Sequence, residues 1–310
     1  MQRICVIDVG SNSIKMLIAE KSSADTAIHR LDEQTEETRI AKGMDSGQLD
    51  QESMLAAVQS ILSLKRYAQH FAPQEIYVTA TSAVRDADNK QRFLALVKQA
   101  TELDVQVLSG QEEAGYIAAG VCQDPSIEEG EFQVLDLGGG SMEVIAFRNH
   151  AVLNKESLQL GAVRLTESLL TDATAPISTK RLNEVGNHVQ STLSNAAFPF
   201  IKSPLLIGLG GAVTHARLLI ASKEGIPFKE SSPILAVKDL ITLRDSLSKL
   251  SLEERISTYD LPPQRADIMP VALQTLISTA TLAGVDSIRH SRYNLRYGIA
   301  STMLTKLFDQ

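Results

Sequence analysis

Short apolar runs ended by polar turns alternate, over the first 120 residues, with stretches whose apolar residues recur at helical spacing. The runs predict strands and the stretches predict helices. The predicted strands are 3–8, 14–20, 75–80 and 105–108, and the predicted helices are 50–70, 88–100 and 111–120. Within the first helix, Leu55, Val58 and Ile61 share one stripe, and Asp50 suits the N-cap. Strands and helices in alternation favour an α/β fold with helices layered on a sheet.

The pattern restarts after the polar stretch 123–131. The second series has predicted strands at 132–136, 143–147, 151–158 and 204–208, a loop at 173–179, and helices over most of the remainder, the last from residue 294. The acidic run 32–37 predicts a solvated strand edge or a loop.

An internal repeat relates the two series. Segment 4–13 aligns with segment 132–141, and each reads as a strand that ends in aspartate, an apolar residue and glycine, followed by small residues and a serine. The two aspartates, Asp8 and Asp136, are 128 residues apart. Chance explains one such motif, but two in the same strand–turn–strand context favour duplication. Two halves on this plan would face each other across a cleft, with one aspartate on each side.

Composition and charge narrow the classes of protein and partner. The 310 residues are 44% hydrophobic and 22% charged, which suits one large or two medium domains and excludes global disorder. The net charge of −7 argues against non-specific nucleic-acid binding, so no DNA partner is expected. There is no run of about 18 apolar residues, so no membrane span is expected. Cys5 and Cys122 form no motif, which favours a cytoplasmic protein without disulfides.

Three turns rich in small residues are candidate phosphate sites, because backbone N–H groups that approach a ligand closely can form an anion nest. Their residues are Ser11, Asn12 and Ser13; Gly138, Gly139, Gly140 and Ser141; and Gly208, Gly210 and Gly211. The third turn also opens a predicted helix, whose N-terminus favours phosphate. A tight turn with close helix packing is the structural alternative for the third turn.

The repeated aspartates point to a cation. Asp8 and Asp136 would repel phosphate directly, so they suggest Mg²⁺ placed between them and the substrate, bound mostly through water. The alternative is that each carboxylate caps its own hairpin turn.

Two further side chains follow predicted strands and have the chemistry for phosphoryl transfer. Glu113, at the start of helix 111–120, could deprotonate a water that attacks phosphorus, although acidic residues also occur there as ordinary caps. Arg85 could bind phosphate oxygens with two N–H groups. A surface ion pair with Asp86 or Asp88 is the alternative for Arg85.

At these residues the sequence resembles the exopolyphosphatase/guanosine pentaphosphate phosphohydrolase family, part of the superfamily of actin, sugar kinases and the Hsp70 ATPase. The similarity extends over the whole chain. Its motifs, in order, are Asp8-Val9-Gly10-Ser11-Asn12-Ser13, Thr81-Ser82-Ala83-Val84-Arg85, Ser109-Gly110-Gln111-Glu112-Glu113-Ala114, Asp136-Leu137-Gly138-Gly139-Gly140-Ser141, Gly208-Leu209-Gly210-Gly211, Arg265-Ala266-Asp267 and Leu295-Arg296-Tyr297-Gly298.

The resemblance implies a fold of two duplicated ribonuclease H-like (actin-like ATPase) domains, α/β in class, that face an interdomain cleft. The expected domains are residues 1–120 plus 295–310, and residues 121–294. Longer relatives continue into a C-terminal helical region, so the length of this chain indicates the short, two-domain form.

The resemblance also implies an activity, namely hydrolysis of a terminal phosphoanhydride that depends on Mg²⁺ or Mn²⁺. It assigns Glu113 as the catalytic base, and Asp136 and Glu143 as catalytic acidic residues beside the metal and the attacking water. Asp8 is assigned to the metal site as well, and Arg85 to the substrate. A monovalent cation such as K⁺ and a homodimer are further features that the resemblance allows.

The expected function is that of an exopolyphosphatase, which releases terminal phosphate from inorganic polyphosphate. The alternatives are a guanosine pentaphosphate (pppGpp) 5'-phosphohydrolase and, less favoured, a small-molecule kinase or a non-catalytic phosphate or alarmone sensor.

Three positions depart from the family pattern, since Gly115 replaces a common arginine, Met142 replaces threonine and Ala212 replaces a frequent threonine. We expect an active enzyme with an altered grip on long chains.

Overall fold

The computed structural model describes residues 1–22, 27–43, 46–196, 198 and 205–308. The chain forms two compact units, the first made of residues 1–127 and 293–310 and the second of residues 128–292. Each unit has a mixed β-sheet flanked by helices, which confirms the α/β class.

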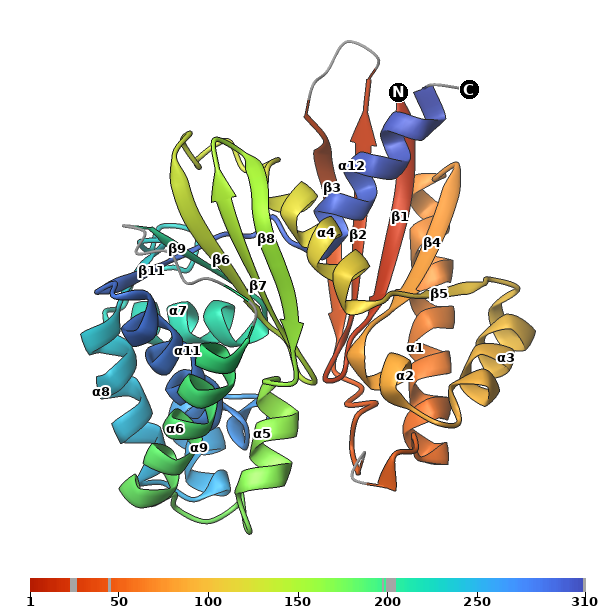
Figure 1. The fold of residues 1–310 in the computed structure, drawn as a ribbon. Helices are drawn as coiled ribbons and strands as arrows, with labels where there is room; N and C mark the ends of the chain where they lie inside the picture. Colours follow the sequence, from red (N-terminus) through yellow and green to blue (C-terminus); the bar gives the residue numbers. More distant parts are fainter. Residues whose placement is uncertain (23–26, 44–45, 197, 199–204, 309–310) are drawn as a thin grey trace. The chain divides into compact units, whose positions relative to one another are not determined.

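The first unit contains a five-stranded sheet in the order β3-β2-β1-β4-β5. Its elements are β1 (Gln2–Val9), β2 (Ile14–Lys21), β3 (His29–Glu36), α1 (Gln51–Ala68), the 3₁₀ helix η2 (Gln69–Phe71), β4 (Glu75–Ala80), α2 (Ser82–Asp86), α3 (Lys90–Thr101), β5 (Val105–Val107), α4 (Gly110–Val121) and α12 (Leu295–Phe308). Helix α12 packs on β1, on β2 and on α4, and α1 packs on the same two strands and on α3 (Figure 1). Strand β1 is therefore covered by helices, and residues 4–7 in it are fully buried.

The second unit contains a six-stranded sheet in the order β10-β11-β9-β6-β7-β8. Its elements are β6 (Glu131–Leu137), β7 (Met142–Arg148), β8 (Ala151–Leu158), α5 (Ala162–Leu169), α6 (Thr179–Asn195), β9 (Leu206–Leu209), α7 (Gly211–Lys223), β10 (Ile234–Ala236), α8 (Val237–Ser248), α9 (Leu252–Tyr259), α10 (Pro263–Ala266), α11 (Met269–Ala283) and β11 (Ser287–His290). Helix α11 is buried on nearly every side, against α5, α6, α7 and α8. None of the helices among the described residues is both long enough and apolar enough to span a membrane.

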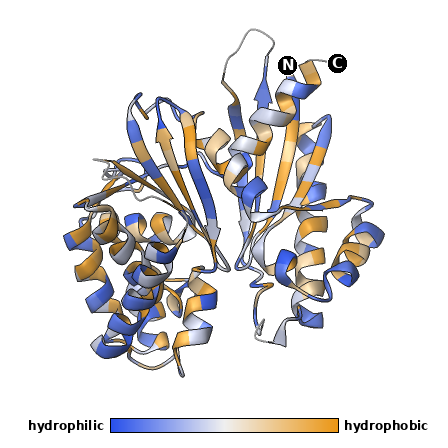
Figure 2. Ribbon diagram, in the orientation of Figure 1, coloured by the Kyte–Doolittle hydropathy of each residue, from blue (hydrophilic) through white to orange (hydrophobic). Residues whose placement is uncertain are grey.

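The two sheets repeat one topology. Read from its β8 edge, the second sheet runs β8-β7-β6-β9-β11, which matches β3-β2-β1-β4-β5 strand for strand. In the first sheet β1, β2 and β3 pair in antiparallel succession, and β4 pairs in parallel with β1. In the second sheet β6, β7 and β8 pair in the same antiparallel succession, and β9 pairs in parallel with β6. The central strands are mainly hydrophobic, whereas the edge strands β3 and β8 carry more hydrophilic residues (Figure 2).

Local irregularities repeat with the same offset as the aspartates. The pairing of β2 with β3 shifts register between Ile18 and Ala19, and that of β7 with β8 shifts between Ala146 and Phe147, 128 residues later. A β-bulge is a specific feature that bends and twists a strand, so its recurrence at an equivalent position indicates that the two halves share one detailed plan.

Most of the predicted elements are present, and the exceptions are short. Strands predicted at 75–80 and 151–158 coincide with β4 and β8, and the N-cap predicted at Asp50 accepts hydrogen bonds from Glu52 and Ser53. The acidic run lies on the exposed edge strand β3, as one of its two interpretations proposed. The sequence pattern missed α2, β10 and β11, which have three to five residues each and are too short for periodicity to reveal. The predicted strand 204–208 is β9, although Pro204 lies outside the described residues.

Helices α4 and α12 cross at two glycines. A Cβ at Gly298 would overlap the carbonyl oxygen of Tyr116, and a Cβ at Gly120 would overlap that of Asn294. The backbones therefore touch directly, which only glycine permits. Because α4 carries Glu113 near its start, this contact sets where that carboxylate lies.

Gly298→Ala should disrupt this crossing, because a methyl group cannot be accommodated against backbone atoms. We expect a loss of about 3 kcal/mol, at the upper end of the cost of overpacking, measured as the urea-unfolding midpoint by circular dichroism. Ser301→Ala, on a half-buried position of the same helix, is the control and should change stability by less than about 0.5 kcal/mol. Equal stabilities of the two variants would show that the crossing tolerates a side chain.

Candidate functional site

Each unit places a tight turn directly after its aspartate-bearing strand. In the first turn (residues 10–13) the Gly10 N–H donates to the Ser13 carbonyl at 3.2 Å, and in the second (residues 138–141) the Gly138 N–H donates to the Ser141 carbonyl at 3.1 Å. The two bonds are equivalent in the repeat, so both hairpins close with the same geometry.

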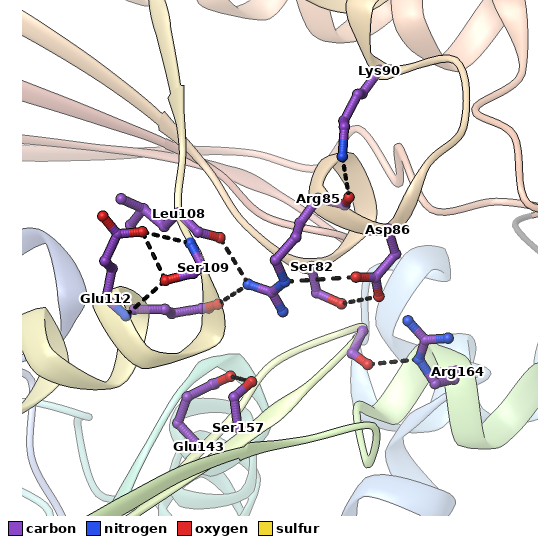
Figure 3. A network of polar contacts seen from close by, with 12 residues as sticks. Ser82, Arg85, Asp86, Lys90, Leu108, Ser109, Glu112, Glu143, Ser157 and Arg164 are labelled. Carbon is purple, nitrogen blue, oxygen red and sulfur yellow. Dashed lines mark hydrogen bonds and ion pairs between the residues drawn. The ribbon is translucent and has the colours of Figure 1, made fainter.

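The carbonyl oxygens of the second turn are bonded to protein donors. Those of Gly138 and Gly139 accept from amides in the first turn of α5 at 2.9 Å, and that of Gly140 accepts from Arg164 Nε at 2.8 Å (Figure 3). Within the described part of the chain, the amides of Gly139 and Gly140 donate to no acceptor. With its carbonyls occupied and these amides unused, the turn presents donors only, which is the arrangement of an anion nest.

The first turn is bound in a similar way by a segment that follows β3. Arg39 N–H donates to the Asn12 carbonyl at 2.8 Å and Ala41 N–H to the Ser11 carbonyl at 3.0 Å, while Asn12 Nδ2 donates to Glu37 at 3.0 Å. Ser11, Asn12 and Ser13 are all buried. The predicted phosphate residues of this turn therefore form a rigid, oriented structure within the first unit.

Three residues on neighbouring strands form a row across each sheet. In the first unit, Asp8 on β1 lies between Thr79 on β4 and Lys15 on β2. In the second unit, Asp136 on β6 lies between Leu209 on β9 and Glu143 on β7. Register partners in a sheet project from the same face, so the carboxylates of Asp136 and Glu143 are direct neighbours.

Glu143 is 2% exposed and accepts a hydrogen bond of 2.7 Å from Ser157 on β8 (Figure 3). Opposed carboxylates supply the oxygen ligands that Mg²⁺ prefers. The pair is therefore the candidate cation site of the second unit.

Asp8 has a different environment. Burial raises the pKa of its carboxyl group above the ordinary 3.8, and the nearby charges of Lys15 and Arg296 oppose this only in part. Its Oδ1 atom is buried and has no hydrogen-bond partner among the described residues. An ionised carboxylate in this position needs a partner that the described part of the protein does not supply.

Adjacent glutamates at the start of α4 have separate roles. Ser109 caps the helix, and Glu112 completes a capping box by accepting from the Ser109 amide at 2.8 Å, which lowers the pKa of Glu112. Glu113 is 6% exposed and forms an ion pair with Arg85 of α2, with Nη1 2.7 Å from its Oε2 (Figure 3). The capping alternative therefore describes Glu112 and not Glu113.

Arg85 is held from several sides. Its Nη1 also donates to the Leu108 carbonyl at 3.1 Å, and its Nε lies 3.6 Å from Asp86, so the predicted surface ion pair with Asp86 is present as a weaker contact. The structure brings Arg85 and Glu113 together in the first unit, which the sequence did not predict.

The glycines of the third turn (residues 208–211) have packing reasons to be glycine. Gly210 has φ of 93°, and a Cβ there would lie 2.8 Å from Asp136 Oδ1 and 2.5 Å from the Leu137 carbonyl oxygen. A Cβ at Gly211 would lie 2.5 Å from an Arg265 nitrogen. The turn packs closely against Asp136 at Gly210 and against Arg265 at Gly211. This packing explains both glycines whether or not the turn also binds phosphate.

Comparisons with known proteins agree with this geometry. Residues 17–307 match the Ppx/GppA phosphatase family. The chain belongs to that family. It is 25% identical to exopolyphosphatase 2 of Mycobacterium tuberculosis, over 98% of this chain and 99% of the relative. It is 26% identical to the guanosine-5'-triphosphate,3'-diphosphate pyrophosphatase of Vibrio atlanticus, over 96% of this chain and 58% of that longer relative.

Solved structures of the Ppx/GppA family share the fold. A crystal structure of an exopolyphosphatase from Cytophaga hutchinsonii superposes with a TM-score of 0.89 at 28% identity, covering 98% of both chains. The Aquifex aeolicus family member superposes with a TM-score of 0.80 at 24% identity, covering 99% of this chain and 98% of the other. The predicted family and the predicted duplicated fold class are confirmed.

The metal that the Ppx/GppA resemblance implies fits the residues present. Asp8 supplies a buried carboxylate oxygen without a partner, and Asp136 and Glu143 supply two opposed carboxylates. No three His, Cys, Asp or Glu side chains in the described ranges gather closely enough to hold a metal alone. The fit rests on donor chemistry, because carboxylate oxygens are the ligands that Mg²⁺ takes from proteins.

Three residues beside the predicted site were not singled out for it from the sequence. Ser157 holds Glu143, Arg164 anchors the second turn and Arg265 packs on the third. Alternation along β8 could have placed Ser157 opposite Glu143, but the contacts of both arginines depend on tertiary packing. Of the three departures from the family pattern, Met142 and Ala212 are buried and Gly115 is half-buried in α4.

Asp8→Asn should stabilise the protein at neutral pH. In the unfolded chain the carboxyl ionises near pH 3.8, and in the fold it ionises at higher pH, so the folded state binds more protons between the two values. Wild-type stability therefore falls as pH rises through that window and stays lower above it. The variant lacks this cost, and its Tm at pH 7 should exceed that of wild type by a few degrees.

The control is Asp32→Asn, because a hydrogen bond from Tyr67 lowers the pKa of Asp32. Ionisation of Asp32 therefore stabilises the fold at neutral pH, whereas ionisation of Asp8 destabilises it. Its Tm at pH 7 should not rise. Scanning calorimetry in metal-free buffer between pH 5 and 8 measures both, and an Asp8→Asn variant less stable than wild type at pH 7 would contradict the burial argument.

Proposed function

We propose that this protein is an exopolyphosphatase that hydrolyses the terminal phosphoanhydride of inorganic polyphosphate. The observation that carries the proposal is the ion pair between buried Glu113, near the start of α4, and half-buried Arg85 of α2, which joins a candidate general base to a candidate phosphate-binding guanidinium. Exopolyphosphatases among the relatives support the same assignment.

Neutralising the terminal phosphoryl group is the first requirement, because phosphoryl transfer depends mainly on positioning and electrostatic stabilisation. In this proposal the unused amides of Gly139 and Gly140, with the Ser141 side chain, bind phosphate oxygens. The carboxylates that would serve a hydrated Mg²⁺ or Mn²⁺ are Asp8 in the first unit and, separately, the opposed Asp136 and Glu143 in the second. Such an ion, when bound, would supply positive charge against the phosphate oxygens.

Water activation is the second requirement. A terminal phosphate offers Arg85 a more highly charged partner than Glu113, so substrate binding would draw the guanidinium away and free the carboxylate. Glu113 then accepts a proton from water as the water oxygen bonds to the terminal phosphorus. The bridging P–O bond breaks in the same step, and the shortened chain leaves with the bridging oxygen.

A pppGpp 5'-phosphohydrolase is the second candidate, because relatives named for that substrate match 96–97% of this chain. The attacked bond and the acidic residues would be the same. Competition between polyphosphate of defined length and pppGpp in one assay separates the two substrates by their kcat/KM values. ATP-dependent phosphorylation of a small molecule without polyphosphate hydrolysis would indicate a kinase, and tight binding without turnover would indicate a sensor.

Glu113→Gln should lower kcat for phosphate release by at least about 100-fold, the usual contribution of a general base. The matched control is the adjacent Glu112→Gln, which keeps a capping-box residue and should stay within about twofold of wild type. Phosphate released from polyphosphate is measured over time for the three proteins, with their Tm values as the test of folding. Equal losses in both variants, or activity of folded Glu113→Gln within a few-fold of wild type, would refute the role of Glu113.

A further inference from the structure

Two side chains that each carry a buried oxygen atom without a partner occupy neighbouring strand positions in the sheet of the first unit. Asp8 on β1 and Thr79 on β4 are register partners in a parallel strand pair, so their side chains project from the same face. Thr79 is 2% exposed. Asp8 Oδ1 and Thr79 Oγ1 are both buried without a hydrogen-bond partner among the described residues.

The fold itself does not require a hydroxyl at this position. In the second unit, the residue beside Asp136 at the equivalent place is Leu209, which is fully buried. The neighbours of Thr79 on β4, Val78 and Ala80, are also apolar and buried. A buried hydroxyl without a partner destabilises a protein relative to an apolar side chain of the same shape.

The cations near Asp8 do not supply the missing partner. Arg296 contributes positive potential at Asp8, but its Nη1 donates to the Met16 carbonyl at 2.9 Å and its Nη2 to Glu33 at 3.3 Å. Lys15 lies on the opposite side of Asp8 from Thr79, because β1 runs between β2 and β4. Neither cation forms a described hydrogen bond or ion pair with the Asp8 carboxylate or the Thr79 hydroxyl.

We propose that Thr79 is a positioning residue for the hydrated divalent cation held at Asp8, an inference that rests on the metal site in the proposed function. Mg²⁺ keeps several of its waters when it binds to proteins, and each water carries two O–H donors. A hydroxyl accepts such a donor and can donate in return, and so can pair with a metal-bound water beside a carboxylate ligand. One hydrated ion thereby satisfies both buried oxygens and fixes the orientation of Asp8.

The test uses Thr79→Val, which removes the hydroxyl and preserves the shape, and Thr79→Ser, which restores it. Binding of Mn²⁺ is measured on the full chain without substrate, by the electron paramagnetic resonance signal of free Mn²⁺. We expect Thr79→Val to bind Mn²⁺ about three- to tenfold more weakly, the effect of losing one hydrogen bond, and Thr79→Ser to stay within about twofold of wild type. The matched control is Thr275→Val, at a buried threonine whose hydroxyl already donates to the Val271 carbonyl at 2.9 Å. It should leave Mn²⁺ binding unchanged.

Stability separates positioning from a merely structural role. Without metal, Thr79→Val should be at least as stable as wild type, because it loses an unpaired buried hydroxyl. If Thr79→Val fails to fold, Thr79→Ala takes its place and must show the same weakening. Unchanged Mn²⁺ affinity in these variants, a wild type that binds no Mn²⁺, or equal weakening in Thr79→Ser would overturn the inference.

The outcome for Thr79 is independent of the reaction catalysed. Hydroxyl-dependent Mn²⁺ binding in a protein that releases no phosphate would refute the exopolyphosphatase proposal and leave this inference standing. Phosphate release from polyphosphate, with a Mn²⁺ affinity that does not depend on residue 79, would refute the inference for Thr79 and leave the exopolyphosphatase proposal standing.

Discussion

The hydrogen bond that closes each aspartate-bearing hairpin, from Gly10 to Ser13 and from Gly138 to Ser141, determines much of the chemistry available to this protein. It turns the chain two residues after each aspartate and sets the strand register that places Asp136 opposite Glu143. Because the carbonyls of the second turn are bonded to α5 and Arg164, its amides remain as donors for an anion. A turn of the same length with free carbonyls would repel phosphate instead.

A second constraint is the rotation of α4 about its own axis, which directs the adjacent side chains of Glu112 and Glu113 to different partners. Glu112 bonds back to Ser109 and stabilises the start of the helix, while Glu113 points to Arg85. The contact between glycine-bearing faces of α4 and α12 holds the helix in place. The two copies of the sheet also differ in the residues beside the aspartate. Asp8 has Lys15 and Thr79 as neighbours, whereas Asp136 has Glu143 and Leu209. Equivalent backbones thus carry unequal charges.

Much of this could be predicted from sequence, for physical reasons that also explain the failures. The long strands β1, β2, β6 and β7 have strong apolar runs, and the repeat of Asp8 at Asp136 revealed the duplication. Short elements such as β10 and β11 contain too few residues to show periodicity. Candidate chemistry was visible in the turns and acidic residues, but the partner of Glu113 was not, since Arg85 lies 28 residues away and meets it only in the fold. The same holds for Arg164 at Gly140 and for Thr79 beside Asp8.

In the proposed reaction, water positioned by Glu113 attacks the terminal phosphorus of a polyphosphate chain. Hydrolysis of polyphosphate of defined length in water enriched in ¹⁸O, with mass spectrometry of the released phosphate, shows which phosphorus is attacked and by what. We expect one solvent oxygen in each phosphate released and remaining chains that shorten from the end one unit at a time. Released phosphate without solvent oxygen, internal fragments as the first products, or transfer of the phosphoryl group to another acceptor would contradict it.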